Sequence, residues 1–105
     1  MTQVFNALGE SNRAAMVSRL ARLGPQPLGK LVEGLPVTRQ AATRHLHVLR
    51  DARVVRIERR GREQLCSLDA ELLKAAELWI RDLENAWDRR MDALQRHLDA
   101  IAEQP

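Results

Sequence analysis

The segment from Thr38 to Ala52 shows the sharpest separation of apolar and polar positions in the chain. Placed at about 100° per residue, its side chains divide into two faces, which predicts an amphipathic α-helix. Thr38 is a suitable N-cap, and the preceding Gly34–Val37 is a turn. The apolar face holds Ala41, Ala42, His45, Leu46, Val48, Leu49 and Ala52.

The polar face of this helix is rich in side chains that hydrogen-bond to base edges or phosphates. Its first acid is Asp51. A charged helix face is most often a solvated face, so a DNA-binding interpretation depends on the flanking segments. His47 lies at the centre of this face, whereas His45 is better interpreted as a partly buried core residue than as a base contact. The remaining polar positions before Asp51 are Arg39, Gln40, Thr43 and Arg44.

Three shorter helices are predicted before this segment. The first covers Thr2–Leu8, and the second runs from an N-cap at Ser11 to about Leu23. The sequence 24–27, Gly-Pro-Gln-Pro, interrupts the helical pattern. A third helix covers 28–33. Two helices joined by a short turn that contains Gly predict a helix-turn-helix over about 28–52.

The periodicity changes after Ala52 and predicts a β-hairpin over about 54–68. Its tip is Arg59-Arg60-Gly61-Arg62, in which Gly61 supplies the positive φ that a tight turn needs. One interpretation is a solvent-exposed tip that its charge keeps soluble. The other is a wing whose arginines contact phosphates or a narrow minor groove.

A long helix is predicted from an N-cap at Asp69 to about Ala102, with a continuous apolar stripe. It would be roughly 50 Å long, more than a domain of this size can cover. A symmetry-related copy of the chain is the simplest partner for the stripe. The alternative is a bent helix, or two helices that fold back on the monomer. The predicted dimer contacts are Phe5, Trp79, Leu83, Trp87, Met91 and Leu94.

The composition fits one small, mainly α-helical domain over 1–105. The chain has 105 residues, 45% of them hydrophobic, with one Phe and two Trp. No apolar run approaches 18 residues, and the N-terminus lacks the features of a signal peptide. The single cysteine, Cys66, excludes an internal disulfide. Together these features predict a cytoplasmic protein without a membrane span.

The net charge of +3 is unevenly distributed. Residues 37–68 carry eight arginines and three acids, a net charge of +5, whereas residues 69–105 have a net charge of −4. A basic middle beside an acidic end suits a surface that meets a polyanion on one side only.

Several strings and their order resemble the ArsR-type (ArsR/SmtB) bacterial winged-helix repressors along essentially the whole chain. The strings are Phe5-x-Ala7-Leu8 with Arg13, then the recognition-helix segment 43–52, and finally Gly61-Arg62-Glu63 followed by Leu68-Asp69. The resemblance implies a homodimer with the first and last helices at the interface. It also implies a palindromic operator and repression that a signal releases.

The chain departs from this family at its metal sites and at Arg53. Segment 28–35, where the family's best-known sensor motif places cysteines, has none, and the neighbours of His97 on the last helix cannot bind a metal. We therefore predict no metal and no cofactor. Cys66 is interpreted as an ordinary strand residue, with a thiol switch as the alternative. Arg53 stands where family members usually have Gly, so it is either strained or the helix exit differs.

These features predict a dimeric, sequence-specific DNA-binding transcriptional regulator, a repressor of the ArsR type on a palindromic operator. The alternative is a winged-helix module that binds proteins without specific DNA binding. An enzyme is not expected, because no phosphate loop or nucleophile–base pair occurs. The partners are double-stranded DNA and a second copy of the chain; a small-molecule inducer is left open. The predicted DNA-binding residues are Thr38, Arg39, Gln40, Thr43, Arg44, His47, Arg59, Arg60 and Arg62.

Overall fold

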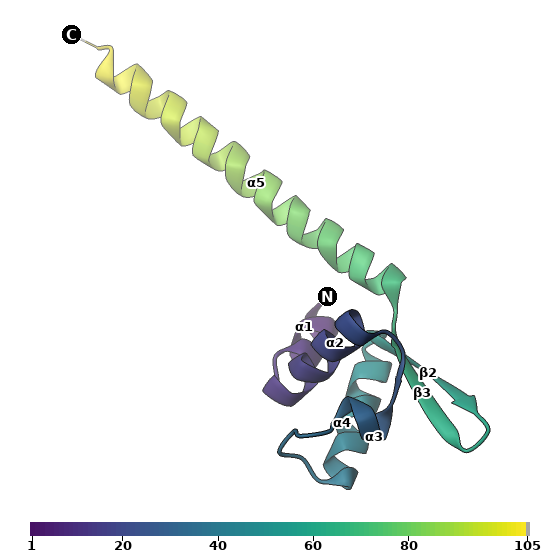
Figure 1. Cartoon of the computed structure of the whole chain (residues 1–105). Coiled ribbons are helices and arrows are strands. Elements are labelled where there is room, and N and C mark those ends of the chain that lie inside the picture. Colours follow the sequence, from purple (N-terminus) through teal and green to yellow (C-terminus); the bar gives the residue numbers. More distant parts are fainter. Residues whose placement is uncertain (105) are drawn as a thin grey trace. The chain divides into compact units, whose positions relative to one another are not determined.

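The computed structural model describes residues 1–104 and confirms a mainly α-helical fold with a small antiparallel sheet and a long C-terminal helix (Figure 1). The elements in chain order are α1 (Thr2–Leu8), α2 (Ser11–Leu23), β1 (Gln26–Pro27), α3 (Leu28–Leu31), α4 (Arg39–Asp51), β2 (Val55–Arg60), β3 (Glu63–Leu68) and α5 (Ala70–Ala102). No helix within residues 1–104 is both long and apolar enough to cross a membrane. The chain forms two compact units, residues 1–73 and the part from residue 74 onward. A single domain over 1–105 stays a prediction.

Two of the helix starts test the predicted caps. The Thr38 hydroxyl accepts a hydrogen bond from the Ala41 backbone N–H at 3.0 Å, which confirms the cap of α4. The predicted cap of α2 at Ser11 is wrong. Glu10 is the N-cap, with an extended backbone and a carboxylate that accepts from the Arg13 backbone N–H at 2.9 Å. A carboxylate is a stronger acceptor for a helix N-terminus than a hydroxyl, because it also meets the positive end of the helix dipole.

The sheet contains one strand that the sequence analysis missed. β2 and β3 form the predicted hairpin, with Val55 opposite Leu68 and Arg60 opposite Glu63. β1 adds to the other edge of β3, so the strand order is β1-β3-β2. It has only two residues, and one of them is Pro27, which an edge strand tolerates because an edge position needs no inward N–H.

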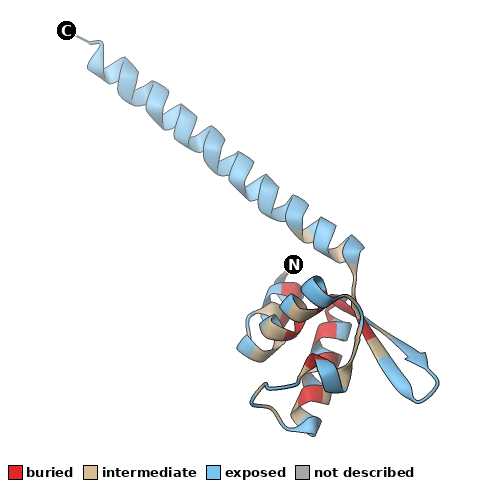
Figure 2. Ribbon diagram, viewed as in Figure 1, coloured by how far each residue is buried: buried red, intermediate tan, exposed pale blue. Residues whose placement is uncertain are grey.

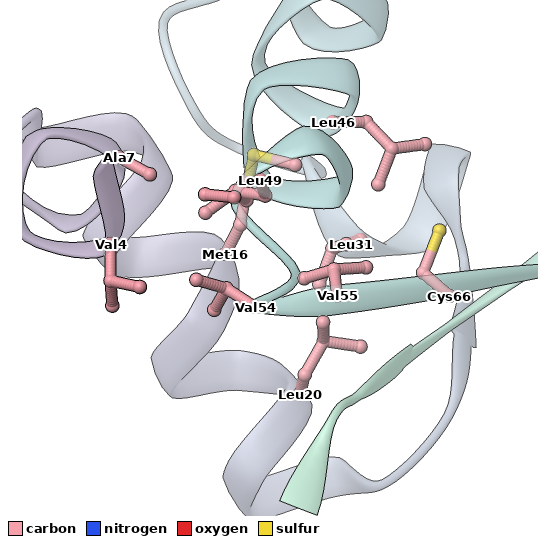
Figure 3. Close-up of a cluster of buried hydrophobic side chains, with 11 residues drawn as sticks. Val4, Ala7, Met16, Leu20, Leu31, Leu46, Leu49, Val54, Val55 and Cys66 are labelled. Carbon is pink, nitrogen blue, oxygen red and sulfur yellow. The ribbon is translucent and has the colours of Figure 1, made fainter. Parts of the chain in front are cut away.

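The core of the first unit lies beneath α4. Leu46 and Leu49 are fully buried, and with Met16 and Val54 they form the centre of one apolar cluster (Figures 2 and 3). The predicted apolar face is correct except at Val48, which is 41% exposed. The other buried members of the cluster are Val4, Ala7, Leu20, Leu31, Ala52, Val55 and Cys66.

The exit from α4 is tied down by two hydrogen bonds. The Arg53 N–H donates to the carbonyl of Arg50 at 2.9 Å, and the Val54 N–H donates to the carbonyl of Leu49 at 2.9 Å. This pattern is a Schellman motif, which requires a left-handed residue after the C-cap. Arg53 has φ 65°, which is the left-handed conformation that family members usually reach with Gly. Of the two alternatives for Arg53, the structure therefore shows the strained residue and not a different helix exit.

Asp69 connects the base of the hairpin to the start of α5. Its carboxylate accepts from the backbone N–H groups of Glu71 at 3.1 Å and Leu72 at 3.2 Å, which confirms the predicted cap. It also pairs with Arg56 at 3.2 Å. The N–H of Leu72 is the main cause that lowers the pKa of this carboxyl below its usual 3.8, and Arg56 contributes in the same direction.

The helix α5 runs without interruption over 33 residues, so the alternative of two shorter helices is wrong. None of its residues is buried (Figure 2). Its polar positions carry helical pairs such as Arg81 with Glu77 at 3.1 Å. The large apolar side chains that are exposed from residue 78 onward are Leu78, Trp79, Ile80, Leu83, Trp87, Met91, Leu94, Leu98 and Ile101.

Replacing Arg53 by Gly should stabilise the protein. Glycine adopts positive φ without the clash of a Cβ, and the expected gain is about 1 kcal/mol in the free energy of unfolding. Arg44→Gly, the same exchange inside α4, is the control and should cost about 1 kcal/mol. Urea unfolding of both variants measures the difference. Equal destabilisation by both would show that Arg53 is not strained.

Asp69→Asn should reveal a stability contribution that depends on pH. Asparagine keeps the capping oxygen but loses the charge. Because the pKa of Asp69 is lowered in the folded state, its carboxylate stabilises the protein above pH 3.8, and this contribution disappears as the pH falls through the folded pKa. The wild type should therefore have the higher melting temperature at pH 7, and the gap should narrow as the pH falls below 3.8. A gap that is constant with pH would contradict this origin.

Candidate nucleic-acid interface

The N-terminal half of α4 presents the predicted contact residues on its outer side. Arg39, Gln40 and Arg44 are exposed, and Thr43 and His47 are half-buried. The Thr43 hydroxyl donates to the carbonyl of Arg39 at 3.1 Å, so its oxygen keeps the capacity to accept a further hydrogen bond. This side of the helix therefore offers donors from arginine and glutamine together with an acceptor from threonine.

The arginines of the chain fall into two groups according to their partners. Arg50 pairs with Asp51 at 3.1 Å and Arg56 with Asp69 at 3.2 Å. Within residues 1–104, by contrast, no ion pair or side-chain hydrogen bond engages the guanidinium groups of Arg39, Arg44, Arg59 and Arg62. These four donors can thus bind an external anion without first breaking an internal bond.

The register of the hairpin separates the wing arginines onto two faces. Arg59 lies opposite Gln64, and Arg60 lies opposite Glu63. Because side chains alternate along a strand, Arg59 and Gln64 share one face and Arg60 shares the other with Glu58. Arg60 pairs with Glu58 at 3.7 Å, and its side chain is 75% exposed.

A groove of about 350 Å³ lies between α4 and the hairpin. It brings Arg39 and Thr43 of the helix together with Arg59 and Arg62 of the wing. In the sequence these residues share only their polar or charged character, and the groove was not predicted. It also missed Gln64, although the alternation of the hairpin places Gln64 on the face of Arg59. The remaining lining residues are Pro27, Leu28, Gly29 and Glu63.

The helix-turn-helix is held by an arginine that the sequence analysis did not identify. One guanidinium nitrogen of Arg19, in α2, donates to the carbonyls of Leu31 at 3.0 Å and Glu33 at 2.6 Å. Leu31 ends α3, and Glu33 lies two residues beyond it in the turn, where carbonyls lack helical partners. Arg19 therefore fixes the turn that leads into α4.

The structure also locates the side chains of His45 and Cys66. His45 is half-buried, as predicted, with its Nδ1 3.2 Å from Arg13. Cys66 is fully buried in β3, and burial raises the pKa of its thiol, which disfavours the reactive thiolate. In the part of the chain that the structure describes, no three or more His, Cys, Asp or Glu residues come together as metal ligands.

Comparison with known proteins agrees with this geometry. Residues 8–58 match the family described as a helix-turn-helix domain. The chain is 35% identical over 98 residues to the HTH-type transcriptional regulator Rv2034 of Mycobacterium tuberculosis, covering 93% of this chain and 88% of that protein.

Solved structures show the same fold. The ArsR-like transcriptional regulator from Rhodococcus sp. RHA1 superposes with a TM-score of 0.79 and 29% identity, covering 90% of this chain and 89% of that chain. A homodimeric winged helix-turn-helix DNA-binding domain from Mycobacterium bovis superposes with a TM-score of 0.63 and 18% identity, covering 80% and 77%. These likenesses, together with the exposed recognition helix and the basic hairpin, show that the chain belongs to the ArsR family of helix-turn-helix transcriptional regulators.

Proposed function

We propose that the chain is a dimeric repressor that binds a palindromic operator through α4 and the β2–β3 wing. The α4 side chains enter the major groove, and the wing arginines meet phosphates or the minor groove. Among the wing arginines, Arg60 makes the weaker contact, because it pairs with Glu58. The observation that carries this proposal is the groove in which Arg39 and Thr43 face Arg59 and Arg62. Among the described residues, the guanidinium groups of Arg39, Arg59 and Arg62 have no internal partner, so they are available to the phosphates of a duplex backbone.

The exposed faces distinguish this function from the alternative of a protein-binding module. Protein interfaces usually have aromatic or large apolar anchors at their centre. The N-terminal half of α4 has none, and the large apolar side chains are concentrated instead on α5. Nucleic acid therefore suits α4 and the wing, and a protein partner suits α5.

The dimer is proposed to form through the apolar stripe of α5, with Phe5 of α1 as the predicted contribution of the first helix. Trp79, Leu83 and Trp87 are 42%, 52% and 64% exposed, and the stripe continues through Met91 and Leu94. Two such helices side by side would bury an area in the range of stable interfaces, roughly 1,200–2,000 Å². The M. bovis relative of the same fold is described as homodimeric. A dimer also matches the two-fold symmetry of a palindrome.

Repression is proposed from the family resemblance, because a dimer bound over a promoter excludes the polymerase. Sensing by metal is not proposed, since segment 28–35 has no cysteine and no ligand cluster occurs among the described residues. A release signal of another chemistry, such as a small molecule, stays open.

Mutations in α4 and mutations in the wing should affect DNA binding differently. Gln40→Ala or Arg44→Ala should cost about 1–3 kcal/mol on the operator and less on random DNA, because a base contact is lost. Arg62→Ala should weaken both duplexes similarly and lower the salt slope by about one, because a phosphate contact is lost. The measurement is a titration on an operator selected from a random library and on a random duplex, at several salt concentrations.

Arg60→Ala is the matched comparison for Arg62→Ala. Arg60 lies on the other face of the hairpin and pairs with Glu58, so its loss should change the salt slope less. If the α4 variants lose operator and random binding equally, α4 does not determine sequence and the assignment is wrong.

The wild type should behave as a dimer of twice the chain mass of 12.0 kDa. A double variant, Leu83→Glu with Trp87→Glu, should be monomeric, because it places charges in the apolar stripe. Arg96→Glu on the polar side of α5 is the control and should stay dimeric. Light scattering at micromolar concentration measures the mass. A monomeric wild type would defeat the proposed interface.

A further inference from the structure

The guanidinium group of Arg13 connects three helices. Arg13 belongs to α2 and is half-buried. Its Nε donates to the carbonyl of Ala7 at 2.7 Å and one Nη to the carbonyl of Asn6 at 3.3 Å. Both carbonyls lie in the last turn of α1, where the Asn6 carbonyl also accepts from the Gly9 N–H at 3.3 Å. The other Nη lies 3.2 Å from Nδ1 of His45, in the middle of α4.

The contact between Arg13 and His45 determines which imidazole nitrogen of His45 carries the proton. An arginine side chain only donates, so the hydrogen bond needs a bare Nδ1 and leaves the imidazole proton on Nε2. Glu10 is the other charged group close to this nitrogen, and its carboxylate lies at 3.7 Å, beyond hydrogen-bond distance. That carboxylate is already bonded to the Arg13 backbone N–H at 2.9 Å. Both partners of the His45 ring thus come from the start of α2.

His45 lies between the side chains that are proposed to face DNA. Arg44 precedes it and His47 follows it by two positions. A bond at His45 therefore restricts rotation of α4 about its own axis at the level of the proposed base contacts. A second bond, from the Gln3 side chain to the carbonyl of Asp51 at 3.3 Å, holds the far end of α4 to α1.

We propose that Arg13 is a positioning residue of the DNA-binding site, which acts through His45 to set the orientation of α4 on the α1–α2 pair. This inference rests on the proposed function. On a palindrome, two α4 helices must lie in major grooves one helical turn apart, about 34 Å. In a dimer whose contacts lie outside α4, this separation depends on how each α4 is held on its own protomer. Arg13 should then be needed when both half-sites of a palindrome are bound at once. It should matter less for binding to a single half-site.

The experiment compares the full palindrome with a duplex that carries a single half-site, at one salt concentration. Arg13→Ala and Arg13→Lys should both weaken binding to the palindrome about tenfold, because a lysine cannot reproduce the forked contacts of a guanidinium. Binding to the half-site should change less than about twofold. Arg22→Ala is the matched control and should change neither affinity. Among the described residues, the side chain of Arg22, in the same helix, bonds only to the carbonyl of Ser18 in its own helix.

A second variant tests the path through His45. His45→Leu should reproduce the effect of Arg13→Ala, and the double variant should be no worse than either single variant, because both remove the same bond. Nitrogen-15 shifts of the wild-type imidazole should show Nδ1 without a proton, a measurement that does not require the variants to fold.

The outcomes separate the two proposals. A protonated Nδ1 in the wild type, equal losses on palindrome and half-site, or additive effects of the two substitutions would each overturn the positioning role and leave the proposed function intact. A wild type that binds no duplex DNA would overturn both.

Discussion

The burial of one side of α4 is the constraint on which the exposed polar face of this helix depends. Leu46 and Leu49 are fully excluded from solvent against Met16 and Val54, and each such side chain contributes roughly 1.5–3 kcal/mol on burial. A helix has a fixed angular spacing, so burying these positions forces Gln40 and Arg44 outward. The chemistry of the interface and the stability of the fold are thus properties of one helix, and rotating α4 would damage both.

The wing depends on the same helix through its exit. The Schellman motif turns the chain at Arg53, and Val54 and Val55 then enter the core directly. Two buried residues immediately after the turn leave little freedom for the direction of β2. The left-handed backbone of Arg53 costs about 1–2 kcal/mol. The two hydrogen bonds of the Schellman motif and the burial of Val54 and Val55 outweigh this cost. The groove between α4 and the hairpin follows from that fixed exit.

The sequence was sufficient to predict an element where its pattern of apolar and polar residues repeats several times. It predicted α4, the hairpin and α5 because each has several repeats of its pattern, and it predicted Thr38 and Asp69 as caps. It failed where a tertiary contact decides. Strand β1 exists only because β3 lies beside it. The Glu10 cap was missed for a local reason, because its carboxylate takes the Arg13 N–H in place of a Ser11 hydroxyl. The roles of Arg13 and Arg19 were equally invisible, since both bond to groups far away in sequence.

A high arginine content is therefore a weak argument for DNA binding until the partners of each arginine are known. Arg13 and Arg19 satisfy carbonyls at helix ends, and Arg56 pairs with Asp69. These side chains stabilise the fold, and their guanidinium groups already bind groups within the protein. In the part of the chain that the structure describes, the guanidinium groups facing the groove bond to nothing internal, which leaves their electrostatic field directed outward. The partners of each arginine, rather than the net charge of +3, therefore decide which arginines can bind an external anion.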